Sequence, residues 1–155
     1  VLQRGHSEKE VLDSLKRRQQ DSENFIHQQA SYADLILSLK PIHSKMLDSL
    51  EKKQPLRLKL IVTIRNGFNE LSIRRALVAI CGLHVDVIVR NDDNEVQMTI
   101  EGDVSAEDIA LVSEMVCSDV LQFLDIPPKW ENGMLGVMQL ITLSNISQEL
   151  TKRFI

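Results

Sequence analysis

Three arginines near the start of the sequence are the side chains best suited to chemistry. Arg4 precedes Gly5, and Arg17 and Arg18 are adjacent within the run KRRQQD. A guanidinium group is always charged and can grip phosphate oxygens through two parallel hydrogen bonds. Side chains of this type are therefore suited to binding phosphate groups. The alternative for Arg17 and Arg18 is a solvated helix face without a ligand.

Motifs of other catalytic sites are absent from the sequence. There is no Gly-x-x-x-x-Gly-Lys-Ser/Thr loop, no Gly-x-Gly-x-x-Gly, no Cys-x-x-Cys and no His-Glu-x-x-His. Cys81 and His84 have a spacing seen in zinc sites, but no second ligand pair accompanies them. Gly133 and Gly136 are expected to supply backbone freedom, with an anion-binding helix terminus as the alternative. We expect no metal site and no catalytic residue in this chain.

Composition sets the class of protein. The 155 residues are 43% hydrophobic and 26% charged, as in an ordinary globular protein. The net charge of -4 argues against nucleic-acid binding. No apolar run approaches the roughly 20 residues of a membrane helix, and no signal-peptide core is present. Cys81 and Cys117 lie in apolar helical patterns, which predicts reduced core residues and a cytoplasmic protein without a membrane partner.

The N-terminal part reads as a polar helix followed by an apolar strand. Ser7 and Glu10 form a capping box, and apolar residues follow at helical spacing, which predicts a helix over 8–19. A second turn-and-helix stretch is expected from residue 21. The run ADLILSL, residues 33–39, is typical of a strand buried on both faces.

The C-terminal part shows clearer periodicities. In LRLKLIVTI apolar residues alternate with polar ones, the pattern of a half-buried strand. Asn69 is expected to cap a helix that stops at Gly82, and Ser105 with Asp108 to cap another. The loop NDDN between two alternating runs predicts an antiparallel hairpin. The predicted elements are strand 56–64, helix 70–81, strands 84–90 and 95–101, helix 106–124, and helix 134–154.

This order, β-α-β-β-α plus a terminal helix, predicts an α+β fold. We expect an antiparallel or mixed sheet of about three to four strands, with helices covering one face. The other face would be a solvated surface, a dimer face or a ligand platform. Its predicted side chains are those of Arg57, Lys59, Arg65, His84, Asp86, Arg90, Glu95, Gln97 and Glu101.

The spacing of the N-terminal residues resembles the lid-to-strand segment of the phosphoribulokinase/uridine kinase family of P-loop kinases, especially its phosphoribulokinase branch. The register agrees without gaps to Asp34, and Gln28 stands where the family usually has proline. The resemblance covers about the first 40 residues. The matching positions are Arg4-Gly5, Glu10-Val11-Leu12, Arg17-Arg18, Asp21, Phe25-Ile26, Gln29, Tyr32 and Ala33-Asp34.

This resemblance implies that the chain is the C-terminal part of an ATP-dependent kinase, cut inside its mobile lid. The parent would phosphorylate a hydroxyl of a sugar phosphate or nucleoside, with ATP and Mg²⁺ as cofactors. The P-loop, the magnesium ligands and the catalytic base would lie upstream, so this fragment alone should bind no cofactor and be inactive. By resemblance, Arg4 is a lid arginine, and Arg17 and Arg18 serve sugar-phosphate binding or effector response.

We therefore expect three parts. Residues 1–42 form the helical lid arm and the last core strand of the kinase fold, 43–55 a connector, and 56–155 an added α+β domain for dimerisation or regulation. The full-length protein is expected to bind a small-molecule substrate and ATP and to form a homo-oligomer. The alternative is a non-enzymatic dimerisation or small-molecule-sensing module with residues 1–55 as a helical arm.

Overall fold

The computed structural model describes residues 8–22, 27–43, 57–65, 68–90, 95–122 and 124–154. Two compact units meet in the sequence between Ala33 and Asp34. The elements are α1 (Glu8–Asp21), α2 (His27–Ala30), β1 (Leu35–Pro41), β2 (Leu58–Ile64), α3 (Glu70–Ala79), β3 (His84–Arg90), β4 (Glu95–Glu101), α4 (Ala106–Val116), α5 (Ser118–Leu121) and α6 (Gly133–Phe154).

The first unit contains α1 and α2. The predicted helix over 8–19 is confirmed, and α1 extends it to Asp21. The short α2 ends in a turn in which the Ser31 hydroxyl donates to the Gln28 carbonyl at 2.6 Å and the Tyr32 amide donates to the Gln29 carbonyl at 3.0 Å. The capping residue Ser7, the Phe25-Ile26 pair and residues 44–55 of the expected connector lie outside the described residues.

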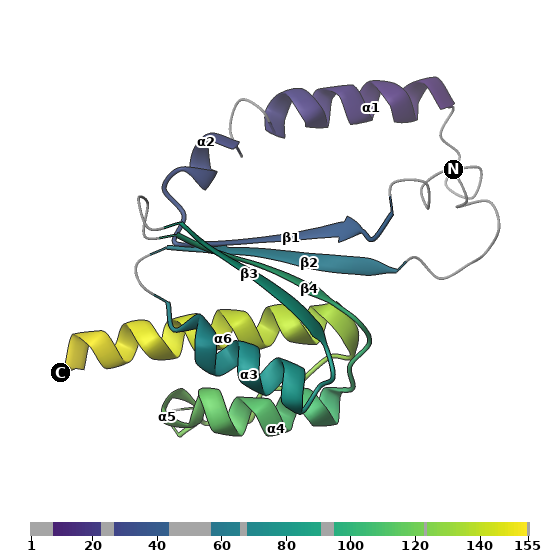
Figure 1. Cartoon of the computed structure of the whole chain (residues 1–155). Helices are drawn as coiled ribbons and strands as arrows, with labels where there is room; N and C mark the ends of the chain where they lie inside the picture. The colour runs from purple at the N-terminus through teal and green to yellow at the C-terminus, as the bar shows by residue number, and fades with distance from the viewer. Residues whose placement is uncertain are drawn as a thin grey trace. The chain divides into compact units, whose positions relative to one another are not determined.

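The second unit is built on a four-stranded antiparallel sheet with the order β1-β2-β4-β3 (Figure 1). Because β4 is antiparallel to both β2 and β3, those two strands run parallel to each other with β4 between them. The helix α3 connects them, so β2-α3-β3-β4 is a split βαβ arrangement. The predicted α+β class and antiparallel sheet are confirmed.

The sheet is apolar on one face because its strands alternate. Leu60, Val62 and Ile64 on β2 have no exposed surface. The register sets them opposite Ile100, Met98 and Val96 of β4, respectively. Side chains of directly opposite residues touch on the same face of an antiparallel pair. These six side chains therefore form the centre of the core.

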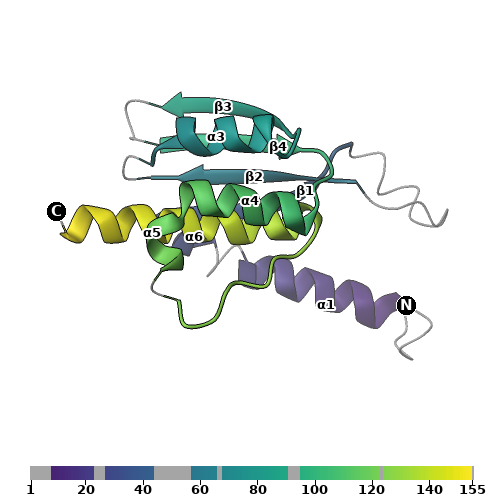
Figure 2. The same cartoon turned by 90° about the horizontal axis from the view of Figure 1, so that it is seen from below.

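Within the second unit, the described helices α3 to α6 all lie on this apolar side of the sheet, as Figures 1 and 2 show. The predicted caps of α3 and α4 are confirmed, since the Asn69 side chain accepts from the Ser72 amide and the Ser105 hydroxyl accepts from the Asp108 amide. The Asn69 amide also donates to the Gln148 side chain at 2.9 Å, which ties the start of α3 to α6. Caps and cross-links of this kind fix where each helix lies on the sheet.

Two expectations were wrong. The helix expected over 106–124 is interrupted at Cys117, whose backbone leaves the helical region at φ -131° and ψ 17°. The apolar stripe continues across the break because Val112, Cys117 and Val120 are all buried, so periodicity alone did not reveal it. The strand expected to be buried on both faces, β1, is only partly buried, and it lies at an edge of the sheet formed by the described strands.

At Gly136, α6 packs closely against Glu131 and Ile109. A Cβ atom at this position would collide with the Glu131 carbonyl oxygen and with the Ile109 side chain. Gly136→Ala should therefore lower the free energy of unfolding by about 3 kcal/mol, although alanine normally favours a helix. Chemical denaturation measures the change.

Gly133→Ala is the matched control, since Gly133 has φ +69° and open space around its Cα. It should cost only about 1 kcal/mol of left-handed strain. If the two variants lowered the free energy of unfolding equally, this would contradict the close approach at Gly136.

Candidate functional site

The structure places two of the three candidate arginines together on α1. Arg17 and Arg18 are exposed, and so is Lys16 beside them. Adjacent helical residues point about 100° apart, so the three exposed cationic groups spread over about 200° of the helix surface in its last turns. Arg4 lies outside the described residues. An anion brought to α1 could therefore meet Arg17 and Arg18 without any rearrangement of buried groups.

The same positions also suit helix stability. Arg18 lies in the last turn of α1, where a cation interacts favourably with the helix dipole. Asp13 precedes Arg17 by four residues, the spacing and order at which acid–base pairs stabilise helices. Each effect amounts to a few tenths of a kcal/mol, which is small beside a charge-assisted phosphate contact.

The strand after this helix joins the second unit through β2. The Arg65 amide donates to the Asp34 carbonyl at 2.9 Å, and the Ile42 amide donates to the Arg57 carbonyl at 3.1 Å. These bonds bracket the ladder in which Leu37 faces Val62. The segment assigned by resemblance to a kinase-core strand thus forms an edge of the antiparallel sheet.

The comparison with protein families bears on this helix and strand. Residues 1–44 match the Phosphoribulokinase / Uridine kinase family. The match covers α1, α2 and β1 and stops before β2, so it extends from the first unit into the second. Searches of curated proteins and of solved structures found no match. The resemblance read from the sequence is confirmed for this segment, which supports a kinase relationship for the parent protein.

In the part that matches the kinase family, the described arginines are Arg17 and Arg18 on α1. Asp21 ends that helix, Gln29 lies exposed on α2, and Asp34 begins the link to β2. The guanidinium groups remain the chemically useful side chains of the matched segment.

The open face of the sheet carries paired charges. Glu95 lies between two arginines, at 3.4 Å from Arg65 and 3.8 Å from Arg90. At the other end of the strands Lys59 lies 3.8 Å from Glu101. The side chains in these pairs are partly exposed, and pairs near the surface contribute only about 0–1 kcal/mol each. Pairing across the strands favours the interpretation of this face as a solvated surface over a ligand platform.

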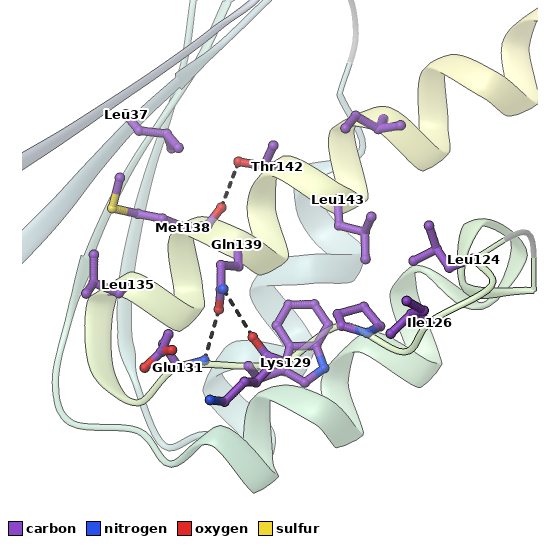
Figure 3. Close-up of a pocket in the computed structure, with 13 residues that line it drawn as sticks. Leu37, Leu124, Ile126, Lys129, Glu131, Leu135, Met138, Gln139, Thr142 and Leu143 are labelled. Carbon is purple, nitrogen blue, oxygen red and sulfur yellow. Dashed lines mark hydrogen bonds between the residues drawn. The ribbon is translucent and has the colours of Figure 1, made fainter.

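An apolar groove in the second unit was not found by sequence reasoning. Its volume is about 700 Å³, and it lies between Leu37 of β1, the outer side of α6 and residues 124–131 (Figure 3). Gln139 fixes one wall, because its side chain accepts from the Glu131 amide at 2.9 Å and donates to the Lys129 carbonyl at 3.3 Å. The apolar residues Leu135 and Ile146 mark this groove, because 57% and 46% of their respective surfaces are exposed.

Neither a metal site nor a membrane span is found in the part of the chain that the structure describes. No three His, Cys, Asp or Glu side chains among the described residues are grouped so that they could hold a metal ion. None of the described helices is both long and apolar enough to cross a bilayer.

Both cysteines are free and buried, as predicted for core residues. Burial raises the pKa of Cys81, and the negative charge of Asp108 raises it further. Burial raises the pKa of Cys117 to about 11, and the nearby Ser144 hydroxyl offsets a smaller part of that shift. Because the thiolate is the reactive form, neither side chain is a nucleophile near neutral pH.

These pKa shifts predict a loss of stability at alkaline pH. The folded state holds the Cys117 proton more tightly than the unfolded state, whose thiol has the ordinary value of 9.0. This contribution is therefore fully present below about pH 9 and is lost as the pH rises towards 11. Urea unfolding of the reduced protein between pH 8 and 11 measures the loss.

Cys117→Ala is the control, because it removes the titrating group and leaves every other alkaline group in place. It should lower stability at pH 8 but flatten the decline above pH 9. Parallel pH curves for the two proteins would contradict a buried, proton-retaining thiol.

Proposed function

We propose that this chain is the C-terminal part of an ATP-dependent kinase that phosphorylates a hydroxyl group of a sugar phosphate or nucleoside. The observation that carries the proposal is the family match over residues 1–44, within which Arg17 and Arg18 lie exposed on one helix. The sequence contains no P-loop motif, so we assign nucleotide binding to another part of the parent protein. We further propose a cytoplasmic enzyme that self-associates.

The arginines fit the demands of phosphoryl transfer. That reaction depends mainly on positioning and on neutralising charge on the phosphoryl oxygens. Guanidinium groups supply both, because their paired N–H donors match two oxygens and their charge does not titrate. We assign Arg4 to the lid, in contact with phosphates of ATP or of the phosphorylated substrate. Arg17 and Arg18 are assigned to the sugar phosphate or to an anionic effector.

ATP and Mg²⁺ belong to the parent enzyme in this proposal. When bound, they supply the transferred phosphoryl group and its charge compensation. The exposed guanidinium groups of this chain fit phosphate oxygens, whereas the P-loop, the magnesium ligands and the general base are assigned to the remainder of the enzyme. The role of this chain is to bind and orient an anionic group, not to abstract a proton.

A second candidate function rests on the second unit. Residues 34–155 form a compact unit with a hydrophobic core and a groove of about 700 Å³. Such a unit could act as a non-enzymatic dimerisation or small-molecule-sensing regulatory domain. The upstream reading frame distinguishes the two functions, because the kinase proposal requires a Gly-x-x-x-x-Gly-Lys-Ser/Thr loop there.

Single substitutions in the full-length enzyme test the arginine roles. Arg4→Ala, Arg17→Ala and Arg18→Ala should each remove a charge-assisted hydrogen bond. We expect at least one to lower kcat/KM by about 10- to 100-fold, because such bonds contribute about 1.5–3 kcal/mol. Initial rates against substrate concentration give both parameters.

Arg74→Ala is the matched control, since Arg74 is an exposed arginine on α3 outside the family match. It should leave kcat/KM within about twofold of the wild type. If all three N-terminal variants behave like this control, the site assignment is wrong.

The 155-residue chain alone should transfer no phosphate from ATP to uridine or ribulose 5-phosphate. The reason is that the proposed nucleotide-binding loop is not in its sequence. A coupled ADP-release assay measures the rate, with the full-length enzyme as the positive control. Turnover by the purified chain above the no-protein background contradicts the proposal.

A further inference from the structure

The groove beside α6 has one wall made by residues 124–131. The Leu124 amide donates to the Leu121 carbonyl at 3.3 Å, which anchors the start of this segment to α5. The Gln139 side chain makes two hydrogen bonds, at 2.9 and 3.3 Å, to backbone groups at its other end. The two prolines between these anchors fix φ at about -65°. Backbone bonds and prolines therefore set the position of this wall.

Apolar side chains stay exposed on both walls of the groove (Figure 3). On the wall formed by residues 124–131, Ile126 is 79% exposed and Leu124 is 40% exposed. Across the groove, Leu135 and Ile146 of α6 are about half exposed. Apolar groups normally come together to leave water. The anchored backbone keeps these groups apart, so a hollow of about 700 Å³ is already formed.

The floor of the groove is continuous with the core. Leu37, Trp130, Met138 and Leu143 line the groove and also pack against the buried core cluster. Their positions are therefore set by the packing of the whole second unit. Binding sites for small molecules are mostly apolar, largely preformed hollows of about 300–1,000 Å³. The groove has these properties.

The charged and polar side chains of the groove do not favour an ionic ligand. Lys129 and Glu131 line the groove with opposite charges. The Thr142 hydroxyl donates to the Met138 carbonyl at 2.8 Å, and the Gln139 amide is bonded to the wall. A charged ligand would lose its water shell without gaining a dedicated partner, which is costly, whereas an apolar body loses little.

We propose that this groove binds a neutral, largely apolar small molecule. The proposal rests on the second candidate function, sensing of a small molecule by residues 34–155, and deepens it by naming the class of ligand. It does not depend on the kinase assignment. The apolar walls favour an apolar body, and the balanced charges of Lys129 and Glu131 favour a ligand without net charge.

A small molecule fits the groove better than a protein partner does. A stable protein interface takes about 800 Å² from each side. The groove follows α6 from Leu135 to Ile146, which is only about 16 Å of helix. Its wall exposes the charged side chains of Asp125, Lys129 and Glu131, and charged residues are depleted from the cores of protein interfaces.

The test is a fluorescence titration of the 155-residue chain with two matched probes. N-phenyl-1-naphthylamine is neutral and apolar, and 8-anilino-1-naphthalenesulfonate is the same molecule with a sulfonate added. Trp130 is the sole tryptophan of the sequence and lines the groove, so quenching of its emission reports binding there. We expect one neutral probe per chain with a dissociation constant below about 100 μM, and at least about 10-fold weaker binding of the sulfonate.

Substitutions in the walls show whether the probe occupies the groove. Leu135→Gln and Ile146→Gln each place an amide in an apolar wall and should weaken the neutral probe about 10-fold. Because both side chains are about half exposed, circular dichroism should be unchanged. Leu111→Gln is the matched control, since Leu111 is a 54% exposed leucine on α4 outside the groove. Its affinity should stay within about twofold of the wild type.

Thr142→Val tests the apolar class of the ligand directly. Valine keeps the shape of threonine but replaces the hydroxyl, which is bonded to the Met138 carbonyl, with a methyl group. The affinity for the neutral probe should be unchanged or higher. A 10-fold loss would show that the hydroxyl is a ligand partner and would overturn the apolar class.

Three other results would overturn the proposal. The first is the absence of saturable quenching up to 100 μM neutral probe. The second is equal or tighter binding of the sulfonate, which would assign the groove to anions through Lys129. The third is an affinity unchanged in both wall variants, or several probes per chain, which marks an open surface of the kind that a protein partner covers. None of these results alters the kinase assays, and loss of the kinase assignment leaves the titrations unchanged.

Discussion

The burial of one face of the β2–β4 pair is the constraint on which the second unit depends. Val62 and Met98 face each other across the two central strands, and neither has exposed surface. Water can be kept from that row only if helices cover it, and α3 and α6 do so on one face alone. The tight approach of α6 at Gly136 and the bond from Asn69 to Gln148 follow from this demand. The polar face and the two sheet edges are what remains for interactions.

The matched segment and this core meet in one strand. The similarity to the Phosphoribulokinase / Uridine kinase family ends at residue 44, just after β1, while the pairing of β1 with β2 makes this strand part of the four-stranded sheet. The strand therefore links the arginine-bearing sequence to a unit with a core of its own.

Strong local patterns made much of the second unit predictable. The alternation in 58–64 and 95–101 and the caps at Asn69 and Ser105 each specify an element without reference to the rest of the fold. Features that depend on neighbours could not be read in this way. The apolar run of β1 suggested burial on both faces, but composition does not reveal which elements cover the faces of a strand, and β1 is only partly buried. The break at Cys117 keeps the apolar stripe intact and so leaves no trace in the pattern.

For the candidate functional site, the sequence predicted which residue types are involved but not the groove formed by distant segments. Adjacent arginines and their spacing pointed to Arg17 and Arg18, and both are exposed on α1. The groove beside α6 was missed because it requires β1, α6 and residues 124–131 together, which are distant in sequence. Exposed leucines on an otherwise amphipathic helix were the hint that sequence alone could give.

A crystal structure of the full-length protein with a nucleotide and a phosphorylated acceptor is the decisive measurement. If the N-terminal arm closes over phosphates, at least one guanidinium group of Arg4, Arg17 or Arg18 should lie within hydrogen-bonding distance, about 3 Å, of a phosphate oxygen. A closed complex in which all three side chains point into solvent would contradict the phosphate-binding role of this arm.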